Sequence, residues 1–237
     1  MSHFFQREFV EITKSIFPEM FANQRVLEIG SLDLCGTVRG YFEHCEYTGL
    51  DIGPGPGVDL VCEGQKYDAP DGSFDVVISC EVMEHNPYWQ ATLQNMVRLL
   101  RPGGLMVMSC ATAWRREHGT SRSEPTSSPL TIARGWEHYG NVSRRDILRQ
   151  VDLTPLSTWS IVTNWEALDL YFLGIKAPGN AEAAQRIAQF ESIYRKRILP
   201  DWKRRAGRIL QSPSRIVTFL GMLTSAVRDR WAGEEMD

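Results

Sequence analysis

Residues 25–51 read RVLEIGSLDLCGTVRGYFEHCEYTGLD, and this stretch decides the fold. Residues 26–29 form a short apolar run that ends in Gly30 and Ser31, a pattern typical of a buried parallel strand leading into a loop. A second strand is expected over 46–51. The spacing therefore predicts the first strand, loop and second strand of an α/β sheet.

Acidic residues lie at the ends of both strands. Glu28 interrupts the first apolar run, and because a buried carboxylate is costly unless it is paired, it is expected to face a polar ligand. A structural salt bridge is the alternative. Asp51 follows the first strand by about 20 positions, where α/β nucleotide-binding folds place the carboxylate that binds a ribose. Asp51 is therefore the first candidate for ligand binding.

Composition indicates an ordinary globular protein. The chain has 237 residues, of which 43% are hydrophobic and 23% charged, enough for one α/β domain with additions. Five cysteines are scattered without a CxxC pair, which favours reduced thiols and a cytoplasmic location over disulfides or a zinc site. The amphipathic start is not a signal segment, and no run reaches transmembrane length.

Strands and helices alternate along the chain. Helices are expected over 3–17, 37–42, 81–100 with a break at Asn86-Pro87, and 143–151; strands are expected over 26–29, 46–51, 58–62, 74–80, 105–110, 156–163 and 169–176. This order predicts an α/β fold: a doubly wound, Rossmann-like seven-stranded sheet with helices on both faces and ligand bound at the carboxyl ends of its strands.

Three parts are expected along the chain. An N-terminal helix occupies residues 1–24, the α/β domain residues 25–178, and a basic helical tail residues 179–237. Within the domain, residues 111–140 are polar and irregular but carry aromatic side chains. A loop of this length in a compact domain favours a functional role, so we expect it to form a lid.

Four motifs carry a resemblance to a known family: VLEIGS at 26–31, GLD at 49–51, DGSFDVVISCEVMEH at 71–85 and LLRPGGLMVMS at 99–109. In these motifs the chain resembles the class I S-adenosylmethionine-dependent methyltransferases of the small-molecule type. One feature departs from the family, because Leu32 and Leu34 replace later glycines of its glycine-rich loop. That departure supports an alternative, a methyltransferase-like binding or scaffold protein without catalysis.

The resemblance implies S-adenosylmethionine as cofactor and assigns eight residues to it. The methionine end would be bordered by Glu28, Gly30, Ser31 and Cys80, the ribose by Asp51, and the adenine by Ile52, Glu63 and Gly64. Asp51 would accept both ribose hydroxyls, since a carboxylate has two acceptor oxygens. Glu63 would accept from the adenine amino group.

Candidates for chemistry lie after the strand at 74–80 and in the lid. His85, His118 and His138 can each take a proton from an acceptor hydroxyl, although core packing or solvent exposure would also explain them. Recognition of a phosphate or carboxylate on the acceptor is expected from Arg115, Arg116, Arg122 and Tyr139. No metal site is expected, because no carboxylate and histidine cluster shows ligand spacing.

The predicted activity is methyl transfer to an oxygen, and less readily a nitrogen, of a polar small molecule such as a sugar-containing metabolite. Methylation of a protein or RNA is an alternative. Residues 1–180 carry a net charge of −7, however, which argues against a nucleic-acid partner.

The tail from residue 181 carries a net charge of +4. Packing on its own domain or on a second subunit is one explanation. Peripheral contact with an anionic membrane is the other, because the apolar stretch 216–227 is too short to span a bilayer.

Overall fold

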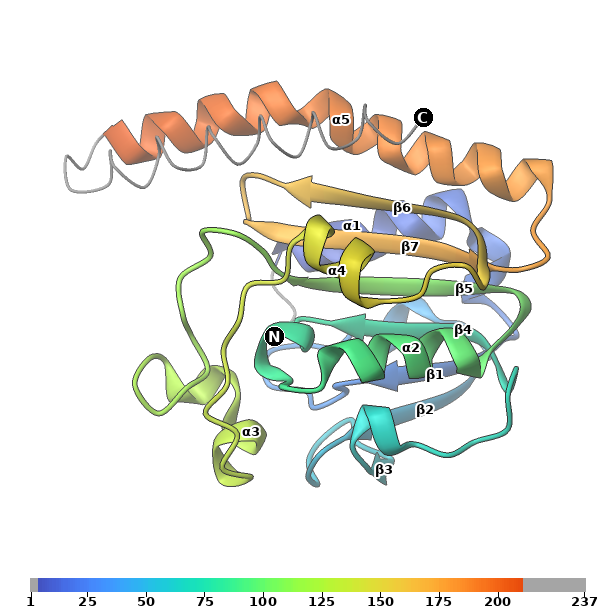
Figure 1. The fold of residues 1–237 in the computed structure, drawn as a ribbon, viewed down its shortest axis with the longest axis horizontal. Helices are drawn as coiled ribbons and strands as arrows, with labels where there is room; N and C mark the ends of the chain where they lie inside the picture. The colour runs from blue at the N-terminus through green and yellow to red at the C-terminus, as the bar shows by residue number, and fades with distance from the viewer. Residues whose placement is uncertain (1–3, 211–237) are drawn as a thin grey trace.

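A seven-stranded sheet organises the computed structural model, which describes residues 4–210 (Figure 1). Its strand order is β3-β2-β1-β4-β5-β7-β6. The strands are β1 Arg25–Ile29, β2 Glu46–Asp51, β3 Leu60–Val61, β4 Phe74–Cys80, β5 Leu100–Ala111, β6 Leu156–Asn164 and β7 Asp169–Lys176. β7 pairs antiparallel with both neighbours, whereas the other pairs are parallel. The predicted Rossmann-like, doubly wound sheet is confirmed.

Side chains of the central strands alternate between two cores, as expected for strands buried on both faces. Val26 of β1 and Val76 of β4 pack into one core, while Leu27 and Val77 pack into the other. All four are completely buried. The sheet therefore needs helices on both faces.

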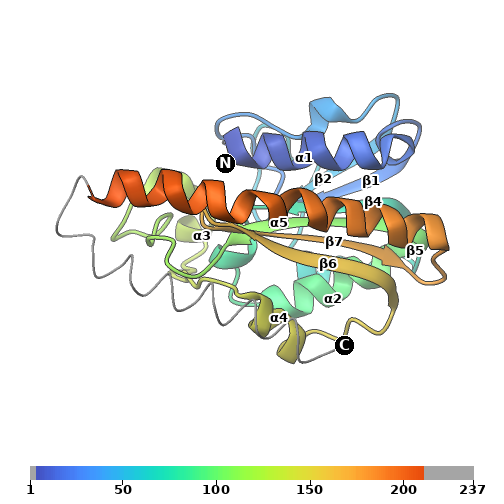
Figure 2. The same ribbon diagram turned by 90° about the horizontal axis from the view of Figure 1, so that it is seen from above.

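Helices cover both faces of the sheet. Figure 2 shows α1 (Phe4–Ile16) on one side, and α2 (Trp89–Leu99) and α4 (Arg144–Gln150) on the other. α5 (Ala181–Leu210) packs against α1 and β6. Both α1 and α5 thus share a core with the sheet, although the sequence analysis placed them outside the α/β domain.

Two expected local structures are borne out. The strand at 74–80 has the predicted bounds, and Ser143 with Asp146 forms the capping box that starts α4. The Asp146 backbone N–H donates to Ser143 Oγ at 3.2 Å, and the Ser143 backbone N–H donates to Asp146 Oδ2 at 2.9 Å. Such a cap satisfies two backbone donors at once.

Several boundaries differ from the prediction. β5 begins at Leu100 instead of residue 105, because a register shift against β4 between Phe74 and Val76 accommodates Pro102 and its glycines within the strand. The region 81–100 divides into a 3-10 turn, η4 (Met83–His85), and α2. The strand at 58–62 shrinks to β3, and the expected helix at 37–42 to the 3-10 turn Arg39–Tyr41.

The tail contains a single long described helix, α5, which continues through Pro200 to Leu210. A proline inside a helix removes one backbone hydrogen bond without necessarily ending it. The apolar stretch 216–227 lies outside the described residues, so its membrane or subunit contacts stay predictions. Within residues 4–210, no helix combines the length and apolar character that crossing a bilayer requires.

Helix α1 is held to the sheet by aromatic contacts. Phe9 stacks on Tyr171 of β7, with ring centroids 4.4 Å apart and ring planes 5° apart. Phe9 is fully buried, whereas Phe4 on the same helix is 65% exposed.

Replacing Phe9 by alanine should lower the free energy of unfolding by about 3–5 kcal/mol, because it leaves a cavity against Tyr171. Phe4→Ala, the matched control, should change it by less than about 0.5 kcal/mol. Urea denaturation followed by circular dichroism measures both. Equal effects of the two substitutions would show that α1 does not depend on the Phe9 contact.

Candidate functional site

A cleft of about 690 Å³ opens at the carboxyl ends of β1, β2 and β4. β1 and β4 are adjacent in the sheet although two strands separate them in the sequence, and ligands of open α/β sheets bind at such a point. Six predicted site residues line the cleft: Gly30, Asp51, Ile52, Gly64, Cys80 and His85.

Asp51 is held in place by the backbone around it. Its Oδ2 accepts from the Leu32 N–H at 3.0 Å, and its Oδ1 accepts from the Ile52 N–H at 2.7 Å. Burial raises the pKa of Asp51 above its ordinary value. Each oxygen has a second acceptor position, so the carboxylate can accept from two adjacent hydroxyls.

Glu28 and Ser31 lie beside this cleft, in a smaller pocket that shares Gly30 and Cys80 with it. Tyr47 donates to Glu28 Oε2 at 2.9 Å. Burial raises the pKa of Glu28 to about 7 despite this hydrogen bond. Ser31 is 3% exposed, and its Oγ has no partner among the described residues. Both side chains can therefore serve a polar ligand group at this end.

Gly30 is required by its surroundings. Its φ is +86°, and a Cβ at this position would lie 2.0 Å from Cγ2 of Val82. Only glycine, which has no Cβ, combines a positive φ with such a close approach to a neighbouring side chain. The contact joins the end of β1 to the chain that follows β4.

Glu63 does not line the cleft, although Gly64 and Gln65 do. Its Oε1 accepts from Lys66 at 3.0 Å and from Arg134 of the lid, and its Oε2 accepts from Gln65 at 2.8 Å. Burial opposes ionisation, but these cations hold the pKa of Glu63 below its ordinary value. Glu63 therefore ties the lid to the cleft wall. The predicted contact with adenine stays untested.

The lid segment, residues 111–140, covers the cleft through a short helix, α3 (Pro129–Ala133). Leu130 and Thr131 of α3 line the cleft, as does Trp136. Leu130 also packs over Gly53, where a Cβ would lie 2.8 Å from its Cδ2. The predicted lid thus contacts the loop that follows Asp51.

A second cleft, of about 1170 Å³, adjoins the first. It is lined by Phe4 and Phe5 of α1 and by polar residues of the lid, and it shares Glu81, His85 and Ser127 with the first cleft. The two clefts thus meet at three residues.

His85 lies at this junction and is 5% exposed. Its ring centroid is 5.0 Å from that of His118 and 5.6 Å from that of Tyr139. Burial, followed by the neighbouring His118, lowers the pKa of His85 to about 3, so its ring is neutral near pH 7. Folding therefore brings together His85, His118 and Tyr139, whereas His138 lines neither cleft.

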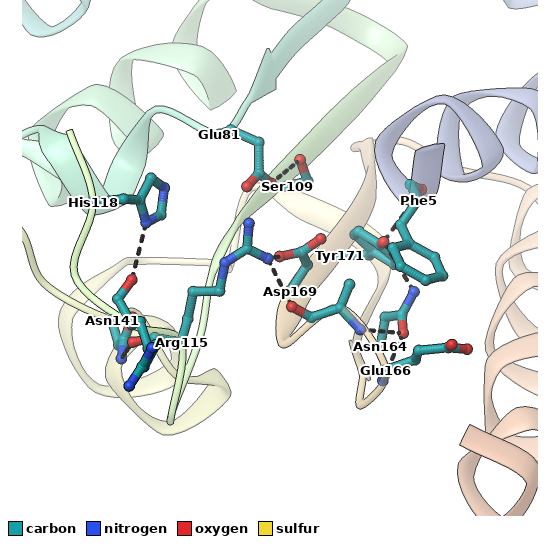
Figure 3. Close-up of polar contacts among 12 residues, drawn as sticks. Phe5, Glu81, Ser109, Arg115, His118, Asn141, Asn164, Glu166, Asp169 and Tyr171 are labelled. Carbon is teal, nitrogen blue, oxygen red and sulfur yellow. Dashed lines mark hydrogen bonds and ion pairs between the residues drawn. The ribbon is translucent and has the colours of Figure 1, made fainter. Parts of the chain in front are cut away.

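Acidic residues engage two of the three predicted substrate arginines. Arg115 donates to Asp169 Oδ1 at 2.7 Å and to the carbonyl of Ala167 at 2.7 Å (Figure 3). Arg122 pairs with Glu117 at 2.8 Å. The exposed Arg116 lines the second cleft.

Residues 1–145 match the family model described as a methyltransferase domain. The chain belongs to this methyltransferase family. The match covers β1 to β5 in full, together with the lid, every residue that lines the first cleft, and the lining of the second cleft up to Ser127. The class I methyltransferase predicted from the four motifs is thus confirmed in family and in fold.

Solved structures share the fold of this methyltransferase. Phosphoethanolamine N-methyltransferase 2 of Haemonchus contortus is 15% identical with a TM-score of 0.52, over 71% of this chain and 52% of that one. The 1,6-didemethyltoxoflavin-N1-methyltransferase of Burkholderia thailandensis is 14% identical with a TM-score of 0.50. The match covers 71% of this chain and 77% of that one. Both contain S-adenosylhomocysteine. This methyltransferase spans about half the length of the first. No curated protein matches its sequence significantly.

Three acidic residues in or near the clefts were not predicted from the sequence: Glu81, which lines both clefts, Glu84, and Asp169, which like Glu81 interacts electrostatically with Glu84. Glu81 follows β4 with a φ of +57°, a strained conformation for a side chain of this kind, and its Oε1 accepts from Ser109 Oγ at 2.9 Å (Figure 3). Glu84 and Asp169 are fully buried. The run Glu81-Val-Met-Glu84-His85 was the available signal, since it concentrates titratable groups after a central strand.

Glu28→Gln should stabilise the methyltransferase above neutral pH. A folded-state pKa of about 7 exceeds the ordinary value of 4.5, so the folded state binds the proton more tightly and wild-type stability falls as pH rises from 4.5 to 7. Arg39 lowers this pKa and Asp51 raises it. Without cofactor, the variant's advantage should grow across that window to at most roughly 3 kcal/mol at pH 8.

Urea denaturation at pH 5 and pH 8 measures this difference, with Asp68→Asn at an exposed carboxylate as the control. An advantage that is the same at both pH values would show that Glu28 is ionised throughout and paired in the folded protein.

Proposed function

We propose that this methyltransferase moves a methyl group from S-adenosylmethionine in the first cleft to a hydroxyl oxygen of a polar small molecule in the second. The observation that carries the proposal is that the two clefts meet at Glu81, His85 and Ser127. A donor and an acceptor held in separate clefts with a common boundary can meet in line, which is the main requirement of a displacement reaction.

The residues of the first cleft fit the donor. Asp51 offers two carboxylate oxygens for a ribose diol, and Ile52 and Leu130 offer apolar surface for a flat base. The Oγ of Ser31, which has no partner among residues 4–210, and the Glu28 carboxylate suit the polar methionine end. When bound, the sulfonium supplies an electrophilic methyl group. The chain's part is to orient both reactants and to exclude water with α3.

The second cleft favours a polyhydroxyl acceptor over an anionic one. Since Arg115 and Arg122 are engaged by acidic residues, the cleft offers few free cations for a phosphate. Its lining includes Glu81, Glu117 and Glu124, whose oxygens accept from hydroxyls. A sugar-containing metabolite fits this lining. A nitrogen acceptor is the second candidate, because carboxylates also attract an ammonium group.

The same proposal gives the protein a cytoplasmic location and no nucleic-acid partner. All five cysteines are free thiols, consistent with a reducing compartment. A non-catalytic binding protein is the competing function, and the specific feature in its favour is that Leu32 and Leu34 line the donor cleft where the family has glycines.

Calorimetric titration of the protein with S-adenosylhomocysteine should give a micromolar dissociation constant. Asp51→Ala should weaken it by about 10- to 100-fold, because it removes both acceptors for the ribose hydroxyls. Asp68→Ala, an exposed carboxylate away from the cleft, is the control. Absence of binding to the folded protein would favour the scaffold function.

A double-mutant cycle on Glu63 and Arg134 separates the two roles of Glu63. If Glu63 acts by holding the lid, Glu63→Gln and Arg134→Gln should each weaken S-adenosylhomocysteine binding, and the double variant should be no weaker than the worse single variant. Calorimetry measures all four proteins. Additive losses would instead indicate that Glu63 contacts the adenine independently of Arg134.

A further inference from the structure

Folding brings Glu84, His85 and His118 together although the sequence showed no ligand spacing. One ligand atom from each residue lies within 4.8 Å of those of the other two. Glu84 and His85 belong to η4, and His118 belongs to the lid. Protein ligands of a first-row divalent ion lie about 2.0–2.2 Å from it, hence roughly 3–3.5 Å from one another. Small side-chain adjustments would bring the three atoms to that separation.

Glu84 is a fully buried carboxyl group that is poorly compensated in the described part of the chain. Its exposure is 0%, and neither Oε1 nor Oε2 accepts a hydrogen bond of good geometry from a described residue, although the backbone N–H of Ala111 lies near enough to favour ionisation. Burial of such a group is costly unless a charge or donor compensates it. A bound cation would supply the missing compensation.

Each histidine has a ring nitrogen available as a ligand. Nδ1 of His118 lies 3.0 Å from the carbonyl oxygen of Arg116, so Nδ1–H donates there and Nε2 keeps its lone pair (Figure 3). An imidazole fixed through its other nitrogen is the usual form of a metal-binding histidine. Nδ1 of His85 is buried and has no partner among the described residues.

The surroundings carry more negative than positive charge. Glu81 and Asp169 both act electrostatically on Glu84, and Arg115 pairs with Asp169 at 2.7 Å. Glu81 and Asp169 thus add negative charge around Glu84. A divalent ion would offset part of it and would favour the ionised form of Glu84.

We propose that Glu84, His85 and His118 form a site for a divalent transition-metal cation at the junction of the two clefts. Two imidazoles and one carboxylate suit ions such as Mn²⁺, Co²⁺ and Zn²⁺. Three protein ligands leave coordination positions open, and these would face the second cleft, which both His85 and His118 line. Adjacent hydroxyls of an acceptor match such positions.

The role of the acceptor in this site rests on the proposed function, whereas cation binding does not. Co²⁺ is therefore the probe, because its visible absorption reports ligand number and geometry without any methyl transfer. The full-length protein, stripped with a chelator, should bind one equivalent of Co²⁺ with saturable absorption. Glu84→Gln and His118→Ala should each weaken this binding by about 100-fold, since each removes one ligand.

His44→Asn is the matched control, because His44 is exposed, has a φ of +54° that asparagine tolerates, and lies outside the cluster. It should keep wild-type Co²⁺ affinity. Thermal unfolding by circular dichroism checks that the Glu84 variant folds. If that variant does not fold, His118→Ala tests the site instead, because it changes a half-exposed residue of the lid.

No saturable Co²⁺ binding to the folded wild type, or unchanged affinity in His118→Ala, would overturn the proposal and leave Glu84 as a protonated core residue. Calorimetry of the same stripped protein with S-adenosylhomocysteine separates the two hypotheses. Cofactor binding without Co²⁺ binding defeats the cation site alone, and Co²⁺ binding without cofactor binding defeats the proposed function alone.

Discussion

Residues 26–28 of β1 pair in parallel with residues 76–78 of β4, and the position of every group in the site follows from this pairing. The register sets the end of β1, at Gly30, beside the chain that leaves β4, at Glu81 and Val82. Gly30 is the residue that permits it, because Val82 occupies the space of a side chain there. The donor cleft is the opening that this juxtaposition creates, with Asp51 contributed by the neighbouring β2.

The strands of the sheet were predictable because each is marked by a pattern within a few neighbouring residues. β4 is a β-branched run bounded by a turn, and Asp51 ends a strand at a fixed distance from the first loop. The lid was not predictable in detail, because tertiary contacts set its path. Gly119, with a φ of +66°, packs so closely on His85 that a Cβ would lie 2.6 Å from its Cε1. No sequence spacing reports such a contact, so the meeting of His118 with Glu84 was missed.

The carboxyl groups of Glu63 and Glu84 have opposite electrostatic environments. Around Glu63, cations from the lid and from Lys66 hold the carboxylate ionised, and the resulting pairs fasten the lid. Around Glu84, burial and the nearby Glu81 instead raise the pKa of the carboxyl well above its ordinary value. The first carboxylate contributes to structure in the free protein, whereas the second is unsatisfied there. Unsatisfied buried groups of this kind are a stability cost that functional sites bear.

The N-terminal helix connects the core to the second cleft. Tyr171 of β7 stacks on Phe9 and donates from its hydroxyl to the carbonyl of Phe5 at 3.3 Å. These contacts fix the first turn of α1, whose Phe4 and Phe5 line the second cleft together with Glu81 and Glu117. In the proposed function, an acceptor that fills this cleft would meet both carboxylate oxygens and apolar surface. Its selectivity would then depend partly on α1, which is positioned by the same aromatic contacts that stabilise the fold.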